Sequence, residues 1–258
     1  MIPAQMVTEW STEHPWQTRE QVEQDLLLSQ AICTVAQHPL LGAELVFRGG
    51  TAFHKLHLSK PERYSEDLDY VRTTSGGIGQ ITGALLDMGK ELEFDVASRM
   101  GEHPKVLWRT SSDAGTPIRI KIEINTHELS PAQSLITLRH AVTSSWWSGT
   151  ADVLTFTPEE LVSTKLRALF QRSKGRDLFD LWLALTHLHL DPARILSSFT
   201  PYRPDRYTAT RAIANLREKL TTGRFRTDLA PLLAGGLAGY DPDVAAELVI
   251  TELLEKIE

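Results

Sequence analysis

The chain has 258 residues, a formal net charge of −6 and 41% hydrophobic residues, which is enough apolar material for one large domain or two modest ones. Its one cysteine, Cys33, excludes an internal disulfide framework and a cysteine-based zinc cluster, and its apolar surroundings indicate a buried thiol. No apolar run is long enough to predict a transmembrane helix, and the first residues do not resemble a secretory signal. We therefore expect a cytoplasmic protein without membrane segments.

The first half of the chain alternates between helix-like and strand-like segments. Thr18 is the expected N-cap of the first long helix, with Gln21 completing a capping box. Apolar spacing and turn residues predict, in chain order, a helix over 18–38, a short buried strand over 43–47, a helix over 51–58, a strand over 68–71, a segment over 78–98 that is first helical and then extended, and strands over 105–110 and 117–125.

The last of these strands, PIRIKIEIN, alternates between apolar and charged residues. Successive side chains of a strand point to opposite faces, so the four isoleucines must pack on a core. The opposite face carries Arg119, Lys121 and Glu123. That face is either exposed to solvent or part of a site.

From Thr157 onward the pattern is helical. Thr157 is an expected N-cap, followed by Pro158 at the first helical position, and helical spacing continues to the C-terminus. We predict two domains, 1–155 and 156–258. Residues 161–226 contain 13 Lys and Arg against 5 Asp and Glu, a formal net charge of +8. This asymmetry indicates either an anionic partner or ordinary solvated helix faces.

Asp67 and Asp69 are two residues apart at the start of a strand, so both carboxylates leave the same face. Two carboxylates this close repel each other unless a cation lies between them, and oxygen ligands of this kind suit Mg²⁺. Such a pair alone also occurs by chance in acidic loops. Glu123 on a neighbouring strand could complete a two-metal site, or it could belong to an exposed row of charges.

A strand, two glycines and a helix meet at the stretch FRGGTAFHK. The backbone N–H groups of Gly49, Gly50 and Thr51 would then lie at a helix N-terminus, where phosphate binds well. Thr51 could also cap the helix, and an ordinary capped turn is the alternative. Lys55, one helical turn later, could touch phosphate or lie on the surface. The P-loop pattern GxxxxGK[ST] is absent.

These residues resemble a known family. The stretch GGTAFHKLHLSKPERYSEDLDYV is similar to the signature of the AbiEii/MenT nucleotidyltransferases, toxins of AbiE-type toxin–antitoxin systems within the DNA polymerase β-like superfamily. KIEIN and EELVSTKLRALFQRSKGRDLFDLW resemble the later motifs of that family, so the match extends over about residues 44–182. The resemblance implies an α+β fold, with a mixed sheet and flanking helices followed by a mostly helical C-terminal domain.

The resemblance also implies roles for individual residues. The expected metal ligands for Mg²⁺ or Mn²⁺ are Asp67, Asp69 and Glu123, although the family usually has Asp at the third position. The expected catalytic residues are the same three acids with Lys165 and Asp177, and Asp180 is an alternative to Asp177. The expected nucleotide-binding residues are Gly49, Gly50, Thr51, Ser65, Lys121 and Lys165.

The function implied by the resemblance is Mg²⁺-dependent transfer of a nucleoside monophosphate from an NTP to an RNA acceptor, with the tRNA 3′ end as the expected acceptor and growth inhibition as the outcome. A winged-helix, AbiEi-like antitoxin is the expected protein partner. Two alternatives remain open. One is transfer to a protein hydroxyl or a small molecule, which the acidic overall charge favours. The other is a non-catalytic nucleotide-binding module.

Overall fold

A computed structural model describes residues 1–128, 130–234 and 239–257 of the chain. The chain divides into two compact units. The first comprises Met1–Pro131 and Leu135–Phe156, and the second comprises Ala132–Ser134 and Thr157–Glu258.

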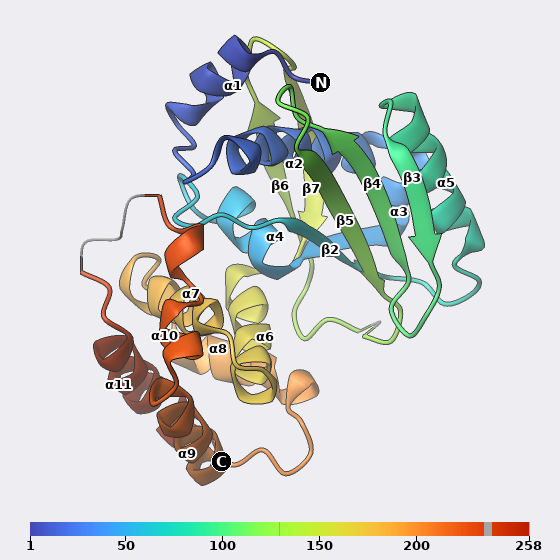
Figure 1. Cartoon of the computed structure of the whole chain (residues 1–258). Coiled ribbons are helices and arrows are strands. Elements are labelled where there is room, and N and C mark those ends of the chain that lie inside the picture. Colours follow the sequence, from blue (N-terminus) through green and yellow to red (C-terminus); the bar gives the residue numbers. More distant parts are fainter. Residues whose placement is uncertain (129, 235–238, 258) are drawn as a thin grey trace. The chain divides into compact units, whose positions relative to one another are not determined.

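The first unit is built on a mixed sheet of seven strands in the order β3-β4-β5-β2-β1-β7-β6 (Figure 1). Strand β1 pairs antiparallel with β2 and parallel with β7, and β2 pairs parallel with β5. The strands are β1 (Leu45–Arg48), β2 (Asp67–Arg72), β3 (Asp95–Arg99), β4 (Lys105–Ser111), β5 (Pro117–Asn125), β6 (Ile136–Val142) and β7 (Gly149–Thr155).

Five helices accompany this sheet: α1 (Ala4–Ser11), α2 (Arg19–Gln37), α3 (Pro39–Glu44), α4 (Gly49–Leu56) and α5 (Gly79–Glu91). Helix α2 packs against β5, β6 and β7, and α5 packs against β3 and β4. The isoleucines of β5 are fully buried, and the indole of Trp108 on β4 donates a hydrogen bond to the carbonyl of Leu85 on α5. The helices therefore cover the apolar face of the sheet, as the alternation in β5 predicts.

Several local predictions are confirmed. The strand over 117–125 has the predicted bounds. Helix α2 begins with Thr18 as N-cap, and Thr18 and Gln21 form both bonds of a capping box. Cys33 is buried.

The prediction for the start of the next helix is wrong. Helix α4 begins at Gly49, two residues earlier than expected, and its N-cap is Arg48. Thr51 therefore lies in the first turn and does not cap the helix. Its hydroxyl instead donates to the carbonyl oxygen of Asp67, at 2.5 Å. The glycines allow this early start because Gly49 adopts a φ of +82°.

Strands β6 and β7 were not predicted from the sequence. Their exposed positions are two threonines, an arginine, an aspartate and an alanine, and the opposite positions include a histidine, a threonine and a glycine, so the period-two signal is weak. Strand β7 is nevertheless an internal strand of the sheet, since it pairs with β1 on one side and with the edge strand β6 on the other.

The second unit is helical in the residues described, in agreement with the expected C-terminal domain. Helix α6 begins after Thr157, whose hydroxyl accepts a hydrogen bond from the backbone N–H of Glu160. The helices are α6 (Pro158–Gln171), α7 (Gly175–Thr186), α8 (Pro192–Phe199), α9 (Ala209–Leu220), α10 (Gly223–Thr227) and α11 (Pro242–Glu252), with short 3₁₀ turns at Thr200–Tyr202, Ala230–Leu232 and Leu254–Lys256.

Segment 132–134 belongs to this unit because of Glu160. The fully buried Glu160 carboxylate accepts hydrogen bonds from the backbone N–H groups of Ala132 and Gln133, at 2.7 and 3.0 Å. It also accepts from the hydroxyl of Tyr202, at 2.5 Å. One buried acid thus joins two segments that are far apart in the sequence, the 132–133 backbone and Tyr202.

Candidate active site

A row of charged side chains crosses four strands on the polar face of the sheet. In the strand register, Arg48 on β1 lies opposite Asp69 on β2, Asp69 lies opposite Glu123 on β5, and Glu123 lies opposite Lys105 on β4. Paired residues of adjacent strands share a face, so these four side chains form one row. Two acids at its centre are flanked by one base on each side.

A second lysine connects the acids. Lys121 lies opposite Asp67 in the β2–β5 register, and its Nζ is 2.8 Å from a carboxylate oxygen of Asp67 and 3.4 Å from one of Glu123. Burial alone would lower the pKa of Lys121, but the hydrogen bond and charge of Asp67 and the charge of Glu123 raise it. Lys121 is therefore held in its cationic form between two carboxylates.

Glu123 is bound by two lysines. Lys105 Nζ is 3.2 Å from the same carboxylate oxygen that Lys121 approaches. Burial favours the neutral acid, but the hydrogen bond from Lys105 and the charges of both lysines lower the pKa of Glu123. Glu123 is therefore an ionised carboxylate, as its expected role requires.

Asp69 differs from the other two acids. Among the residues that the structure describes, none makes a hydrogen bond or ion pair with its side chain, although it is half-buried. Burial and then the charge of Asp67 raise the pKa of Asp69. A partly desolvated carboxylate beside a second carboxylate fits a cation-binding position, because a bound cation would relieve both effects.

The glycine corner lies directly against this acid. A Cβ placed on Gly49 would be only 2.4 Å from Oδ2 of Asp69, so only glycine leaves room for the carboxylate. The first turn of α4 thus begins beside Asp69. Its leading N–H groups have no acceptor within the helix, which makes the corner suitable for an anion.

Polar side chains fix the position of this corner. The Thr51 hydroxyl is 2.9 Å from the Ser65 hydroxyl, and Thr51 also bonds the backbone at Asp67, so α4 and the start of β2 are joined. The guanidinium of the buried Arg63 lies against Gly50, where a Cβ would be 2.6 Å from Nη2. The corner therefore combines backbone donors with a nearby positive charge.

The donor chemistry of the acids suits Mg²⁺, which binds hard oxygen ligands and usually takes only one or two carboxylates together with substrate phosphates. Asp67 and Asp69 supply such a pair. Within residues 1–128, 130–234 and 239–257, no three Asp, Glu, His or Cys side chains are already placed to hold a metal ion. Lys121 and Lys105 hold Glu123 instead, so the predicted third ligand is paired with lysines in this structure.

The remaining predicted residues form a separate cluster in the second unit. Lys165 Nζ is 2.8 Å from Asp180 and 3.6 Å from Asp177, and all three side chains are buried. Arg172 donates two hydrogen bonds to Asp177, at 2.7 and 2.8 Å. Both aspartates that the sequence left as alternatives therefore neighbour Lys165, and Asp180 makes the shorter contact.

Sequence reasoning missed two members of the charged row, Arg48 and Lys105. Arg48 ends β1, and its guanidinium pairs with Glu128 and lies 5.8 Å from the ring centre of Phe156. Lys105 could have been found from the hairpin between β4 and β5. Pairing Ser111 with Pro117 across the turn places Lys105 opposite Glu123.

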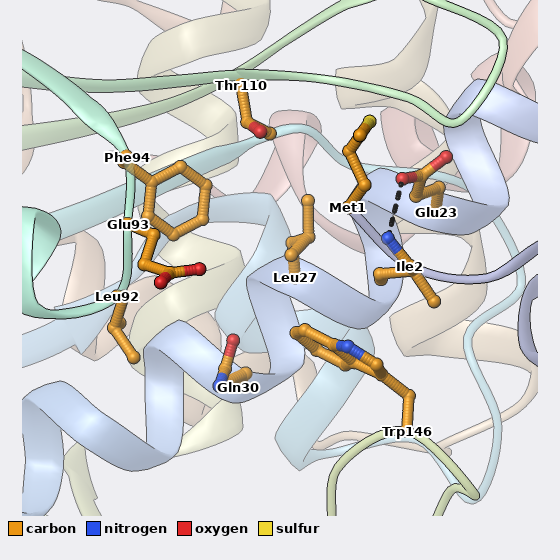
Figure 2. A pocket seen from close by; sticks show the side chains of 10 residues that line it. All are labelled: Met1, Ile2, Glu23, Leu27, Gln30, Leu92, Glu93, Phe94, Thr110 and Trp146. Carbon is orange, nitrogen blue, oxygen red and sulfur yellow. Dashed lines mark hydrogen bonds between the residues drawn. The ribbon is translucent and has the colours of Figure 1, made fainter.

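A small cavity of about 190 Å³ lies in the first unit between the N-terminal residues, α2 and the β3–β4 region (Figure 2). Its lining combines apolar side chains with two glutamates, a glutamine and a threonine. The buried Glu23 accepts a hydrogen bond from the backbone N–H of Ile2, drawn as the dashed line in Figure 2. Burial raises the pKa of Glu23. The N-terminal residues Met1 and Ile2 therefore form part of the wall of this cavity.

The sheet order, the glycine corner and the acids beside it together define a nucleotidyltransferase core. A family model described as "Nucleotidyl transferase AbiEii toxin, Type IV TA system" matches residues 30–248, so the chain belongs to the AbiEii family of type IV toxin–antitoxin systems and is a nucleotidyltransferase. Membership implies a nucleotide substrate and an antitoxin partner. The resemblance inferred from the sequence is confirmed.

Solved structures support the fold. MenT4, a nucleotidyltransferase toxin from Mycobacterium tuberculosis H37Rv, superposes with a TM-score of 0.69 over all of this chain and 91% of its own, at 15% sequence identity. An antigenic nucleotidyltransferase-like protein from Paracoccidioides brasiliensis covers 75% of this chain and 87% of its own, at 17% identity. Its TM-score of 0.43 is too low to support an argument.

A search of curated proteins found no match. Among the described residues, no helix has the length and apolar character needed to cross a membrane.

Proposed function

We propose that this nucleotidyltransferase transfers a nucleoside monophosphate from an NTP to an RNA acceptor and that the charged row on β1, β2, β5 and β4 is its active site. The observation that carries the proposal is the position of Asp69. Its carboxylate has no partner among the described side chains and lies directly against the glycine corner at the start of α4.

The proposed chemistry is displacement at phosphorus. The acceptor hydroxyl oxygen forms a bond to the α-phosphorus, the bond from that phosphorus to the β-phosphate oxygen breaks, pyrophosphate leaves with the electron pair of that bond, and the hydroxyl proton passes to solvent water. Negative charge spreads over the phosphate oxygens during this step, so catalysis depends mainly on positioning and electrostatic stabilisation.

The residues of the first unit can supply both the positioning of the substrate and the electrostatic stabilisation of its phosphates. The N–H groups of Gly50 and Thr51 would bind phosphate oxygens at the start of α4, with Arg63 nearby as a positive charge. Ser65 and Thr51 hold the corner in place through their mutual hydrogen bond. Lys121 would offset the triphosphate charge, because its ammonium already lies on the acid-bearing face of the sheet.

Asp67 and Asp69 would hold Mg²⁺ or Mn²⁺, with Glu123 as the third acid. When bound, the ion would supply charge neutralisation at the phosphates. Glu123 would be available once a nucleotide draws Lys121 and Lys105 toward its phosphates. Lys165 and Asp177 of the second unit are proposed as further catalytic residues on the basis of the family resemblance alone.

The acceptor is proposed from two arguments. The family resemblance suggests the tRNA 3′ end, and the excess of basic residues over 161–226 suits a nucleic acid, since phosphate contacts dominate such affinity. Binding of total tRNA should weaken steeply as salt concentration rises. Salt-insensitive binding would contradict an RNA acceptor.

The test is a transfer assay with each of four α-³²P-labelled NTPs and a cell extract, with and without Mg²⁺. We expect label to enter RNA only with Mg²⁺ and to be lost in Asp69→Asn. Asp113→Asn, in the exposed turn between β4 and β5, is the matched control and should retain activity. Label in protein would favour the alternative acceptor that the net charge of −6 suggests. Absence of any transfer would contradict the proposed reaction.

A further inference from the structure

The polar face of the first unit carries two exposed arginines beside the charged row. Arg109 on β4 lies directly opposite Arg119 on β5, and the two strands lie side by side (Figure 1). Arg119 is two positions before Lys121 and four before Glu123, so its side chain leaves the same face of β5 as theirs. Both arginines line an open hollow of about 420 Å³. This arginine pair is therefore accessible to a ligand from solvent.

The arginine pair brings two like charges together. Side chains directly opposite each other in an antiparallel pair have Cβ atoms about 4.5–5.5 Å apart, and like charges at such positions destabilise a sheet. Arg109 makes one long ion pair, 3.5 Å to the exposed Asp95. The side chain of Arg119 makes no hydrogen bond or ion pair with any residue that the structure describes. A bound anion would relieve the repulsion between the two guanidinium groups.

Two further residues shape the hollow. The side-chain amide of Gln24 on α2 donates a hydrogen bond to the carbonyl oxygen of Arg119 at 2.8 Å, which fixes the backbone at this end of β5. Glu66, the residue before Asp67, is exposed and also lines the hollow. Its charge opposes an anion there, but the two arginines outnumber it. Removal of the Glu66 charge should therefore favour anion binding.

The arginine pair and the glycine corner lie on opposite sides of the acids. In the sheet order β4-β5-β2-β1, the two acids on β2 lie between β5, which carries Arg119, and β1, which ends at the glycine corner. The attacking and leaving oxygens of phosphoryl transfer lie roughly in line, on opposite sides of the phosphorus. If the leaving pyrophosphate is held at the glycine corner, the acceptor approaches from the β5 side.

The distance along β5 suits an acceptor strand. Arg119 and Lys121 are two residues apart, which is about 7 Å along a strand, and Glu123 lies about 7 Å further. A ligand group held at the arginine pair is therefore separate from the acids but close enough to belong to the same polynucleotide. Arginine suits a phosphate here because its planar guanidinium can donate two parallel hydrogen bonds to the phosphate oxygens.

We propose that Arg109 and Arg119 bind a backbone phosphate of the RNA acceptor, a short distance along the strand from its reacting hydroxyl. This inference rests on the proposed transfer to RNA and adds the route by which the acceptor reaches the acids, across β4 and β5 of the first unit. The negative charge of the RNA backbone complements the two arginines, and phosphate contacts dominate affinity for nucleic acids.

The test is a fluorescence titration of total tRNA in EDTA, which prevents Mg²⁺-dependent transfer, at a series of KCl concentrations. The double variant Arg109→Ser/Arg119→Ser should weaken binding about tenfold or more. The slope of the logarithm of the binding constant against that of the salt concentration should fall by about 1 for each arginine removed. Arg109→Lys/Arg119→Lys keeps both charges and should retain most of the slope, whereas Glu66→Gln should tighten binding.

Arg139→Ser is the matched control. Arg139 is an exposed arginine on the edge strand β6, separated from β5 by β2, β1 and β7. Its loss should leave tRNA affinity and salt dependence unchanged. The double variant should also keep the melting temperature of the unmodified chain, because both arginines are exposed. It should keep the affinity for NTP in the presence of Mg²⁺, since the triphosphate is assigned to the glycine corner.

The proposal is wrong if the unmodified chain does not bind tRNA, or if the double variant binds it with unchanged affinity and salt dependence. An equal loss in Arg139→Ser would also refute it, because the effect would then be one of total charge. A parallel loss of NTP affinity would place the arginines at the triphosphate instead. The transfer assay separates this surface from the reaction. Label in RNA with unaltered tRNA binding by the double variant would refute only the surface, whereas arginine-dependent tRNA binding without transfer would refute only the reaction.

Discussion

Replacing Gly49 with alanine should damage both the fold and the proposed active site. Gly49 has a φ of +82°, a conformation that costs an L-residue with a Cβ about 1–2 kcal/mol. The new Cβ would also lie 2.4 Å from Oδ2 and 3.0 Å from Cβ of Asp69. Rotation of the Asp69 carboxylate could move Oδ2 away, but the Cβ of Asp69 is fixed to the backbone of β2, so full relief requires β2 or the start of α4 to move.

The two costs can be combined. Overpacking of this kind typically costs about 1–3 kcal/mol, so the whole change should lower the free energy of unfolding by about 2–5 kcal/mol. For a chain of this size, each kcal/mol shifts the melting temperature by about 2–4 °C. The expected decrease in melting temperature is therefore about 4–20 °C.

Gly115→Ala is the matched control. Gly115 lies in the turn between β4 and β5 with a φ of +81°, but a Cβ there would meet no atom within 4 Å. Gly115→Ala should lower the free energy of unfolding by only the backbone cost of about 1–2 kcal/mol, and it should retain transfer activity. Thermal unfolding and urea unfolding by circular dichroism measure both variants, and the difference between them isolates the contact with Asp69.

Equal free energies of unfolding for Gly49→Ala and Gly115→Ala would show that Asp69 can move away from the new Cβ without loss of stability. If Gly49→Ala also retained full nucleotide transfer, the close approach of Asp69 to the glycine corner would have no role in catalysis. A stable Gly49→Ala protein without transfer activity would instead support that role, because only the site would have changed.

Three further results are expected. Asp69→Asn should raise the melting temperature at pH 7.5 in the absence of divalent ions. The pKa of Asp69 is raised in the folded chain, so its negative charge destabilises the fold at any pH above the ordinary aspartate pKa, and asparagine removes that charge. The gain in melting temperature should vanish near pH 4, where the carboxyl of the unfolded chain is also protonated. Glu160→Gln should lower the unfolding free energy by about 1–3 kcal/mol in urea, because an amide N–H would face donors that now bind a carboxylate. Thr51→Val should lower the free energy of unfolding by about 1 kcal/mol, because the hydrogen bond to the carbonyl of Asp67 is lost, and it should weaken NTP binding in equilibrium titrations. Thr51→Ser keeps the hydroxyl, so its stability and NTP affinity should match those of the unmodified chain.

Local signals in the sequence were sufficient for much of the fold. The alternation in β5 fixed its bounds and its buried face, and the capping pattern at Thr18 fixed the start of α2. The spacing of Asp67 and Asp69 required that both leave one face of a strand, and the register confirms it. These features depend only on residues close together in the chain, so a short window contains the necessary information.

Contacts between distant segments could not be predicted in this way. The sequence offered Lys55 as a phosphate contact or a surface residue, yet the packing of α4 against α2 buries its ammonium beside Asp25. The sequence offered Glu123 as a metal ligand, yet the β4–β5 and β2–β5 registers give its carboxylate two lysines. Neither pairing follows from spacing along the chain.

The sequence by itself determined the family, the order of most elements in the first half and the chemical types gathered near the glycine corner. Only the tertiary structure decided which charged groups become neighbours: within the described part of the chain, Asp69 lies against Gly49 without a side-chain partner, and Lys121 lies between two acids. The physical reason is that periodicity specifies the face on which a side chain lies, whereas its charge state and partners depend on burial and on neighbours brought from other strands and helices.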